Sequence, residues 1–514
     1  MGVCDDINKN YVNPRSQKFF NDLSEKQTIS SPANNGLSEK IQLKVLINPI
    51  NKNCKYNIRL YNIIGNQNYP LNQNEECSIS DNSTVILNSQ IFITYFFEKE
   101  QPLLIEIFKT ENGIPKKYEM RTTVGCIMGS RHNTYQKNIS ISEKEMIIIQ
   151  AEKLAQSEGI INIKFEVHPN SHINFRSKNK IYYEIYSDIS ILYRSECFND
   201  QGKFNPVKIP LSLFKNNTIR IIFINNTKEF QQEFNLDINE LRLGKIFKIT
   251  KMGTPIEILS NSAITKNYTF VDYLKAGIQI GLAVAIDFTG SNGNPNDSSS
   301  LHFINGNTPN QYERAIIACG NIVAYYDYDQ LFPSFGFGAK INNTPTLLFN
   351  LNFQDDPNIN YIQGIIDAYH NALNSVELWG PTNFAPIIRK MNNKIREQGH
   401  NLKYHILMIL TDGIIDDLDA TIDELVEGSF LPLSVIIIGV GQADFSNMVY
   451  LDADENPLIS SKGVKSVRDL VQFVPFLKYE LHPENLAMEV LAEIPRQIMD
   501  FYDQQNLDPD KLCH

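Results

Sequence analysis

The stretch IQIGLAVAIDFTGS, residues 278–291, passes from an almost wholly apolar run straight into a polar loop. Such a run is typical of a strand that is buried on both faces of a sheet. In sheets of parallel strands, ligands bind beyond the carboxyl ends of the strands, where Asp287, Thr289 and Ser291 stand. The stretch therefore predicts a doubly wound α/β domain with a functional site after this strand.

The sequence on either side of this stretch extends the same pattern. Further apolar runs at 347–353, 405–410 and 433–438 predict the other central strands. Between them, apolar residues recur at helical spacing in 312–323 and 362–369, and a last helical pattern at 486–502 is expected to bend at Pro495. We expect this domain to span 265–505, with a tail at 506–514.

The front half of the chain has a different periodicity. Many short segments alternate apolar and polar residues with period two, among them 41–45, 56–60, 103–107, 161–165, 181–186 and 219–224. They fall into two sets, which predict two all-β sandwiches at 37–150 and 155–250. Residues 1–36 are polar with few apolar positions and are expected to form a flexible arm.

Composition narrows the classes of protein to consider. The chain has 514 residues and a net charge of -11, yet residues 37–250 carry 27 Lys and Arg against 22 Asp and Glu, a balance that suits contact with anionic lipid. No basic stripe for nucleic acid is present. The seven cysteines include no C-x-x-C pair, so neither a zinc site nor a disulfide framework is indicated. Without a secretory leader or a spanning run, a cytoplasmic protein is expected.

The amino terminus carries a candidate lipid anchor. Met1-Gly2-Val3-Cys4 presents Gly2 for myristoylation and Cys4 for a second, reversible acyl chain, although Asp6 stands where the pattern has Ser or Thr. A single myristoyl chain anchors only marginally without a second signal.

Three loops of the α/β domain offer oxygen ligands. Asp287, Thr289 and Ser291 form a D-x-T-x-S loop, Thr382 lies in a Gly-Pro-Thr-Asn turn, and Asp412 ends the strand at 405–410. Two carboxylates and three hydroxyls suit Mg²⁺ or Mn²⁺ and leave the ion able to attract an Asp or Glu of a partner protein. Alternatively, each loop by itself serves only to cap a helix or a turn.

These loops resemble the metal-ion-dependent adhesion site (MIDAS) of von Willebrand A domains, and the sequence around them resembles the copine family. The stretches that carry this resemblance are 287–295, 310–315, 335–340, 380–386, 432–437, 471–476 and 493–497. The resemblance implies a multidomain fold, with two all-β C2-type sandwiches followed by an α/β doubly wound von Willebrand A domain. It also implies that Thr289, Ser291 and Thr382 bind the metal directly, and that Asp287 and Asp412 act largely through water.

The family resemblance implies a cytosolic protein that moves to phospholipid membranes when calcium rises and brings protein partners with it. Calcium-binding C2 loops need clusters of aspartates. Here the corresponding segments 48–53, 109–110, 168–172 and 225–228 hold Asn, Lys and His, so Ca²⁺ binding is expected to be lost or very weak. Membrane contact would then rest on basic residues, for which the candidates are Lys116, Lys117, Arg176, Lys178 and Lys180.

The function expected from these features is that of a non-enzymatic adaptor in signalling or membrane trafficking. It would lie on the inner face of the plasma membrane or on endomembranes and bind an acidic segment of a protein partner through the metal. The alternatives are a soluble A-domain scaffold, a calcium-dependent copine of the usual kind, an extracellular adhesion protein, and a metal-dependent hydrolase. For a hydrolase, the sequence offers no identifiable base beside the loops and only G-x-G fragments at 336–338 and 439–441.

Overall fold

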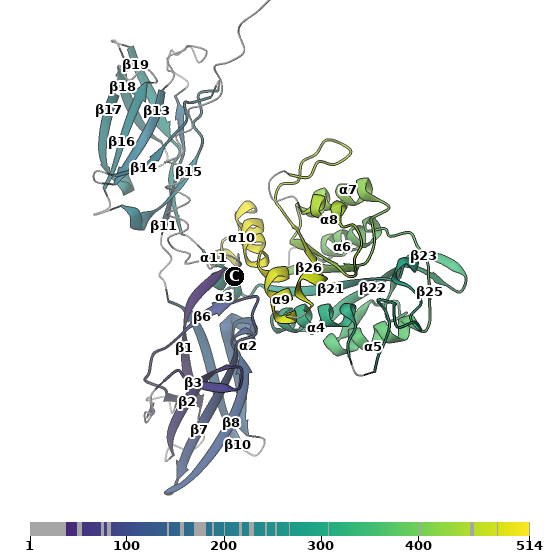
Figure 1. Ribbon diagram of the computed structural model, residues 1–514. Helices are drawn as coiled ribbons and strands as arrows, with labels where there is room; N and C mark the ends of the chain where they lie inside the picture. The colour runs from purple at the N-terminus through teal and green to yellow at the C-terminus, as the bar shows by residue number, and fades with distance from the viewer. Residues whose placement is uncertain are drawn as a thin grey trace, which may run out of the picture. The chain divides into compact units, whose positions relative to one another are not determined.

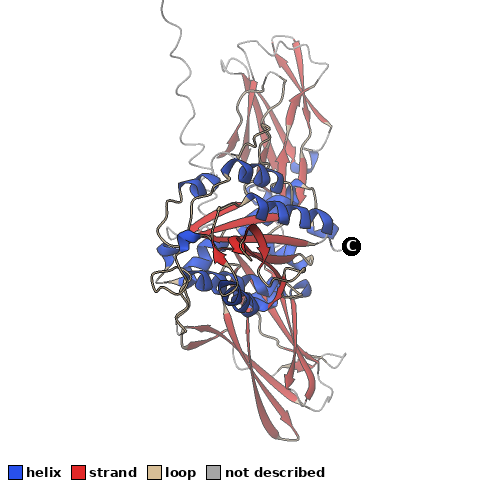
Figure 2. Ribbon diagram, turned by 90° about the vertical axis from the view of Figure 1, so that its right-hand side faces the viewer, coloured by secondary structure: helices blue, strands red, loops and turns tan. Residues whose placement is uncertain are grey.

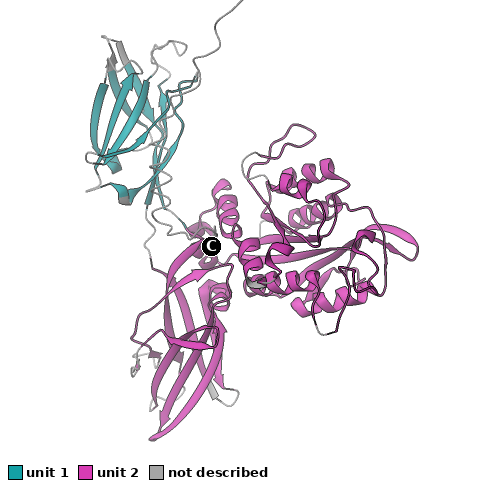
Figure 3. Ribbon diagram, in the orientation of Figure 1, with its two compact units in different colours: residues 1–33, 155–268 teal, residues 34–154, 269–514 magenta. Residues whose placement is uncertain are grey.

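The structure is a computed structural model that describes residues 37–512, apart from internal gaps. The gaps lie at 49–53, 73–76, 80–83, 141–142, 155–158, 169–180, 188–189, 200, 215–217, 226–230, 242–243, 252–253, 267, 307, 400–401, 453–456 and 481. The chain divides into two compact units (Figure 3). The smaller unit holds 1–33 and 155–268, and the larger unit holds 34–154 and 269–514.

The larger unit begins with a sandwich of two antiparallel sheets, here named the front sandwich. Its described strands are β1 (Ser38–Asn48), β2 (Lys55–Ile64), β3 (Gln67–Pro70), β4 (Ser78–Ile79), β5 (Val85–Ile86), β6 (Ile91–Phe96), β7 (Pro102–Glu111), β8 (Ile114–Thr123), β9 (Thr134–Ser140) and β10 (Glu143–Lys153). One sheet has the order β4-β5-β1-β10-β9 with β6 also paired to β1, and the other has the order β3-β2-β7-β8. Ile41, Leu43, Val45 and Ile47 of β1 are buried while the residues between them are more exposed, so the period-two alternation defines the core face.

The smaller unit contains the second sandwich, here named the inserted sandwich. Its described strands are β11 (Gly159–Ile163), β12 (Phe165–Val167), β13 (Ile181–Ser187), β14 (Ser190–Arg194), β15 (Val207–Pro210), β16 (Thr218–Asn225), β17 (Gln231–Asp237), β18 (Lys245–Lys251), β19 (Thr254–Ser260) and β20 (Ala263–Lys266). Their sheet orders are β15-β11-β20, β12-β19-β18 and β14-β13-β16-β17. Phe165, Tyr183, Phe223 and Phe247 meet in its core at ring distances of 4.9–6.1 Å.

The inserted sandwich extends beyond its predicted boundary at residue 250. Strand β19 pairs with β12 and β18, and β20 pairs with β11, so the sandwich continues to Lys266. The polar residues 261–262 separate β19 from β20, so the last two strands are short and not joined in one apolar alternation.

The rest of the larger unit is an α/β domain around one mixed sheet (Figures 1 and 2). Its strands are β21 (Gln279–Asp287), β22 (Leu331–Ile341), β23 (Thr344–Asn350), β24 (Asn358–Asn360), β25 (Glu377–Leu378), β26 (Lys403–Thr411), β27 (Leu433–Gly439) and β28 (Val471–Pro475). The order is β23-β22-β21-β26-β27-β28, with β22, β21, β26, β27 and β28 parallel. The prediction of a central strand at 347–353 is wrong, because β23 is an antiparallel edge strand.

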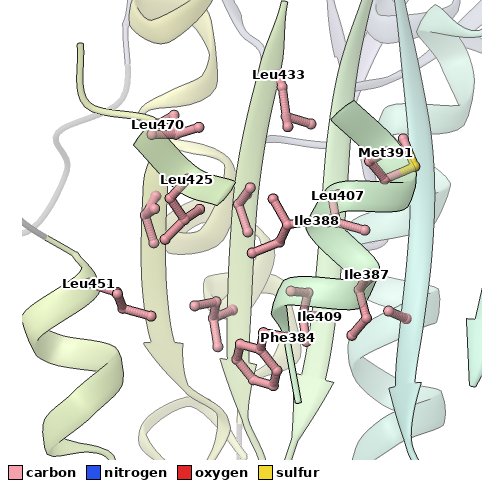
Figure 4. Close-up of a cluster of buried hydrophobic side chains, with 14 of the residues drawn as sticks. Phe384, Ile387, Ile388, Met391, Leu407, Ile409, Leu425, Leu433, Leu451 and Leu470 are labelled. Carbon is pink, nitrogen blue, oxygen red and sulfur yellow. The ribbon is translucent and has the colours of Figure 1, made fainter. Parts of the chain in front are cut away.

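Helices cover both faces of this sheet. They are α3 (Phe270–Lys275), α4 (Gln311–Val323), α5 (Tyr361–Leu373), α6 (Ala385–Gln398), α7 (Leu418–Gly428), α8 (Ser446–Leu451), α9 (Pro483–Leu491), α10 (Ile494–Gln504) and α11 (Pro509–Leu512). Helices α6, α7 and α8 lie on one face, and α4, α5 and α9 on the other (Figures 1 and 2). On the first face, Ile387, Ile388 and Met391 of α6 pack against side chains of β26 and β27 (Figure 4).

The front sandwich and the α/β domain meet at a buried seam within the larger unit. The hydroxyls of Tyr95 and Tyr326 lie 2.7 Å apart, and Phe97 packs edge-on against Phe270 at 5.3 Å. Glu39 accepts hydrogen bonds from Thr269 Oγ1 and Val271 N at the start of α3. Because these contacts are both apolar and polar, the seam fixes one domain against the other.

Candidate metal centre

Asp287 ends β21 and is fully buried. Its Oδ1 accepts a hydrogen bond from Thr289 N at 2.8 Å, and its Oδ2 accepts one from Thr411 Oγ1 at 2.6 Å. Thr411 ends the neighbouring parallel strand β26, so the sheet itself brings the two loops together. Both carboxylate oxygens are thus oriented by residues at the carboxyl ends of adjacent strands.

Asp412 and Ser291 close the arrangement across the two loops. Ser291 Oγ donates to Asp412 Oδ1 at 2.9 Å, and Asn292 Nδ2 donates to the same oxygen at 2.9 Å. The hydroxyls of Thr289 and Ser291 are 3.0 Å apart. Four of the five predicted ligands are therefore linked into one hydrogen-bonded group.

The third loop joins this group through backbone contacts. Gly290 N donates to Trp379 O at 2.8 Å, and Trp379 N donates to Phe288 O, so the loop before Thr382 runs beside the loop after β21. A Cβ on Gly413 would lie 3.4 Å from Thr382 Oγ1 and 3.8 Å from Ser291 Oγ. Both hydroxyls therefore face the same small space, which the lack of a side chain at Gly413 keeps open.

The donor set fits a hard divalent cation. Asp287, Asp412, Thr289, Ser291 and Thr382 present only oxygen atoms, as Mg²⁺ and Mn²⁺ prefer. Within the described residues, no group of three or more His, Cys, Asp or Glu side chains is placed to hold a metal, so this mixed set of carboxylates and hydroxyls is the candidate centre.

Burial controls the ionisation of the two carboxyl groups. Burial, followed by the nearby charge of Asp412, raises the pKa of Asp287 to about 7, although the hydrogen bonds from Thr289 and Thr411 act to lower it. Burial likewise raises the pKa of Asp412. A cation held between these groups favours their ionised forms and would lower both pKa values.

Several residues besides the predicted ligands shape the centre. Asn292 and Thr411 orient the carboxylates, and Tyr312 OH donates to Asn292 Oδ1 at 2.6 Å. Asp416 Oδ2 accepts from Thr382 N at 2.8 Å, while Asp416 N donates to Thr382 O. The adjacent carboxylates Asp416 and Asp417, four and five residues after Asp412, are the sequence signal that indicates Asp416.

A cavity of ≈ 450 Å³ opens beside the centre. Ser291 and Asp412 form part of its wall, and the rest comes from Leu301, Gln311, Gly441, Gln442, Ala443 and Leu477. Of the predicted ligands, Ser291 and Asp412 therefore border this cavity.

His302 is buried and stacks on Tyr312 at 4.6 Å between ring centroids. Its Nδ1 lies 2.7 Å from Tyr369 OH, and burial lowers its pKa to about 3. His302 is thus a neutral residue of the core.

A buried lysine lies in one of the segments compared with the calcium loops. Lys109 Nζ is 2.8 Å from Glu145 Oε1, and Tyr56 OH donates to the same oxygen at 2.8 Å. Lys109 and Glu145 are only 6% and 3% exposed. An ammonium group therefore neutralises the buried carboxylate in this part of the front sandwich. Residues 49–53, 169–172 and 226–228 of the other compared segments lie outside the described residues.

Of the predicted lipid-binding residues, only Lys116 and Lys117 lie in the described part of the chain. Lys116 and Lys117 lie on β8, and Lys117 Nζ is already 2.7 Å from Glu106 Oε1. Arg176, Lys178 and Lys180 lie outside the described residues and in the other unit. Gly2 and Cys4 also lie outside the described residues. Among the described helices, none combines the length and apolar character needed to cross a bilayer.

A family model described as Copine matches residues 300–510. Among solved structures, the two calcium-bound C2 domains of Extended-Synaptotagmin 2 align with 9% identity over 46% of this chain and 100% of that one, at a TM-score of 0.18. Proximal thread matrix protein 1 of the mussel byssus, with a zinc-occupied MIDAS motif, aligns with 16% identity over 41% of this chain and 46% of its own, at 0.23. Human GIVD cytosolic phospholipase A2 aligns with 8% identity over 76% and 52%, at 0.17. No functional statement about this chain follows from the structural alignments.

Proposed function

We propose that this chain is a copine-like, non-catalytic adaptor that binds a protein partner through a divalent metal and associates with anionic membranes through its sandwiches. The match of residues 300–510 to a family model described as Copine supports this proposal. The observation that carries the proposal is the convergence of Asp287, Thr289, Ser291, Thr382 and Asp412 around the space beside Gly413.

In this proposal, the three hydroxyls and two carboxylates hold Mg²⁺ or Mn²⁺. When bound, the ion would offer a coordination position to one carboxylate oxygen of the partner. Thr411 and Asn292 keep the two aspartates oriented by hydrogen bonds, so little reordering is needed on binding. Asp416 positions the Thr382 loop through a pair of backbone contacts. The neutral, hydrogen-bonded His302 supports a binding role rather than a hydrolytic one.

We further propose that membrane association does not depend on calcium. The Lys109–Glu145 ion pair supports this idea for the front sandwich, because the carboxylate that could help to bind a cation already has an ammonium partner. Membrane contact then depends on exposed basic residues such as Lys116, or on an acylated amino terminus.

Metal-dependent recognition is tested by titrating the full chain with a pentaglutamate peptide in Mg²⁺ or EDTA. We expect binding in Mg²⁺ only, and loss of at least about tenfold in affinity in Thr382→Val, which keeps the side-chain shape but removes the hydroxyl. Thr346→Val on β23 makes the same change away from the centre and should bind normally. Equal binding in EDTA would contradict the proposal.

Membrane association is tested by sedimentation of the full chain with phosphatidylserine vesicles in calcium, in magnesium and in chelator. Binding in all three conditions is the expected result, with weakening at high salt because the attraction is electrostatic. Binding in calcium alone would indicate a calcium-triggered copine.

A soluble scaffold is the second candidate, favoured by the neutralisation of Lys117 by Glu106 and Glu119. Metal-dependent peptide binding without sedimentation of an acylated chain would support it.

A further inference from the structure

A second cavity lies away from the metal centre, inside the larger unit, and measures ≈ 800 Å³. Its walls come from four elements. The end of β2 and the turns after β2 and β6 supply one side, and helices α4 and α9 supply most of the other. A volume of this size is typical of sites that bind small organic ligands, which are often found where two domains meet.

The cavity walls are mostly apolar. Ile63 and Ile64 come from the front sandwich, Ile317 and Ala318 come from α4, and Met488 comes from α9. Ile64 is 59% exposed and Ile317 is 36% exposed, so apolar surface that faces this cavity remains in contact with water. Covering it with an aliphatic chain would be favourable.

One buried polar atom in the wall has no partner among the described residues. Glu98 is 2% exposed and lines the cavity, and its Oε2 accepts no hydrogen bond from any described group. Burial raises its pKa. An unsatisfied buried carboxyl oxygen is costly, so a ligand that donates a hydrogen bond to it gains more than the contact alone.

The other charged groups of the wall already have partners in the protein. Arg314 donates to Glu480 O and lies over the ring of Phe476 at 5.2 Å. Lys99 Nζ lies 4.2 Å from the centre of the Phe96 ring, and Glu100 accepts a hydrogen bond from Tyr325 OH. The acidic group that still needs a donor is therefore Glu98, and the complementary ligand carries a cationic head.

We propose that this cavity binds a small single-chain amphiphile whose protonated primary amine donates to Glu98 and whose aliphatic chain lies between Ile64 and Ile317. The site does not depend on the metal centre, because none of the five predicted metal ligands lines it. A bound amphiphile would contact both the front sandwich and α4, and so would stabilise the seam between them.

The test is calorimetric titration of the full chain, in EDTA, with octylamine, octanol and octanoate below their micellar concentrations. We expect octylamine to bind about tenfold or more tightly than octanoate, because the protonated amine donates a charge-assisted hydrogen bond to Glu98 whereas the carboxylate has no donor and is repelled. Glu98→Gln keeps the shape of the side chain and should remove most of the preference for octylamine over octanol. Equal affinities for the amine and the carboxylate in the native chain would overturn the proposal.

Two further variants test the location of the site. Ala318→Trp should fill the cavity and abolish binding of all three compounds, and unchanged binding would overturn the proposal. If Ala318→Trp does not fold, Ile64→Ser removes an exposed wall residue at little risk to the core and should weaken all three compounds several-fold. Ile114→Ser, similarly exposed on the hairpin between β7 and β8, is the matched control and should bind normally.

Discussion

Gly413 keeps open the space that Thr382 and Ser291 face. In Gly413→Ala the new methyl group would make ordinary contacts at 3.4 Å and 3.8 Å with the two hydroxyl oxygens, so the fold should tolerate it. A metal ion needs that space, so the affinity for Mg²⁺ or Mn²⁺ should fall by about tenfold or more, measured by calorimetry. Gly306→Ala, where a Cβ would meet nothing within 4 Å, is the control. Unchanged affinity in Gly413→Ala would place the metal elsewhere.

His405 provides a pH-dependent contribution to stability. Burial lowers its pKa from 6.5 to about 3, with help from the charges of Lys403 and Lys394. Between these two values the unfolded chain binds a proton that the folded chain does not, so stability falls as the pH falls, by up to about 1.4 kcal/mol per pH unit. His405→Leu should lose this part of the slope in urea denaturation series at several pH values.

Asp327 lines the same small cavity as His405 and acts in the opposite sense. Burial raises its pKa to about 6, so its proton stabilises the fold as the pH falls. The contribution of His405 must therefore be taken as the difference between the native chain and His405→Leu. Identical slopes in the two proteins would show that His405 is protonated in the folded state.

At the scale of elements, the start of α6 depends on a distant carboxylate. Asp417 accepts hydrogen bonds from Phe384 N and Ala385 N, at 2.9 Å and 3.0 Å, and so caps the helix that follows Thr382. Asp417→Ala should cost about 1–2 kcal/mol in the free energy of unfolding and also weaken metal binding, because the segment that follows Thr382 loses these two hydrogen bonds while only the contacts of Asp416 remain.

The matched control for this change is Asp419→Ala. Asp419 is an exposed acidic residue in the first turn of α7, and the change should leave both stability and metal affinity nearly unaltered. A normal metal affinity in Asp417→Ala, despite lower stability, would show that the cap of α6 does not affect metal binding.

The sequence pattern predicted a strand correctly where the strand is a continuous apolar run, and missed a strand where Gly and Pro interrupt the run. The runs that became β21, β26 and β27 are continuous and apolar, and the structure confirms them as neighbouring parallel strands. Strand β22 escaped notice because Pro333, Gly336 and Gly338 interrupt its pattern. Those glycines are required by close packing, since a Cβ on Gly336 would lie 2.2 Å from the Phe349 ring and one on Gly338 would lie 2.3 Å from the Thr289 methyl.

The predicted metal ligands converge because each follows a strand or a turn at one edge of the sheet. The ends of apolar runs can be recognised in a single sequence, so these positions could be predicted. The residues that orient them were harder to find. Asn292, Thr411 and Asp416 act through hydrogen bonds between loops, and which loops touch depends on the three-dimensional arrangement.

At the scale of the whole molecule, the division into units predicts two separable unfolding transitions in calorimetry. The front sandwich should unfold together with the α/β domain, because Tyr95, Phe97 and Glu39 tie them at the seam. Tyr326→Phe removes the hydroxyl that pairs with Tyr95 and should cost the larger unit about 1–3 kcal/mol. Three independent transitions would contradict the seam.

Tyr183→Phe is the matched control in the other unit. Tyr183 is fully buried, and its hydroxyl has no partner among the described residues, so losing it should not destabilise the inserted sandwich. The change should leave the transition of the larger unit where it was.

The sequence showed two sandwiches in succession and gave no sign that the first associates with a domain beyond the second. The seam also orders events during synthesis. The ribosome completes the front sandwich well before it makes α3 and Tyr326. At ordinary rates of translation the interval between the two events is roughly ten to thirty seconds. Throughout that interval Tyr95 and Phe97 have no surface to bind. The nascent chain therefore exposes an apolar surface that chaperones can bind. When several ribosomes translate one message, two such surfaces on neighbouring chains can also associate incorrectly.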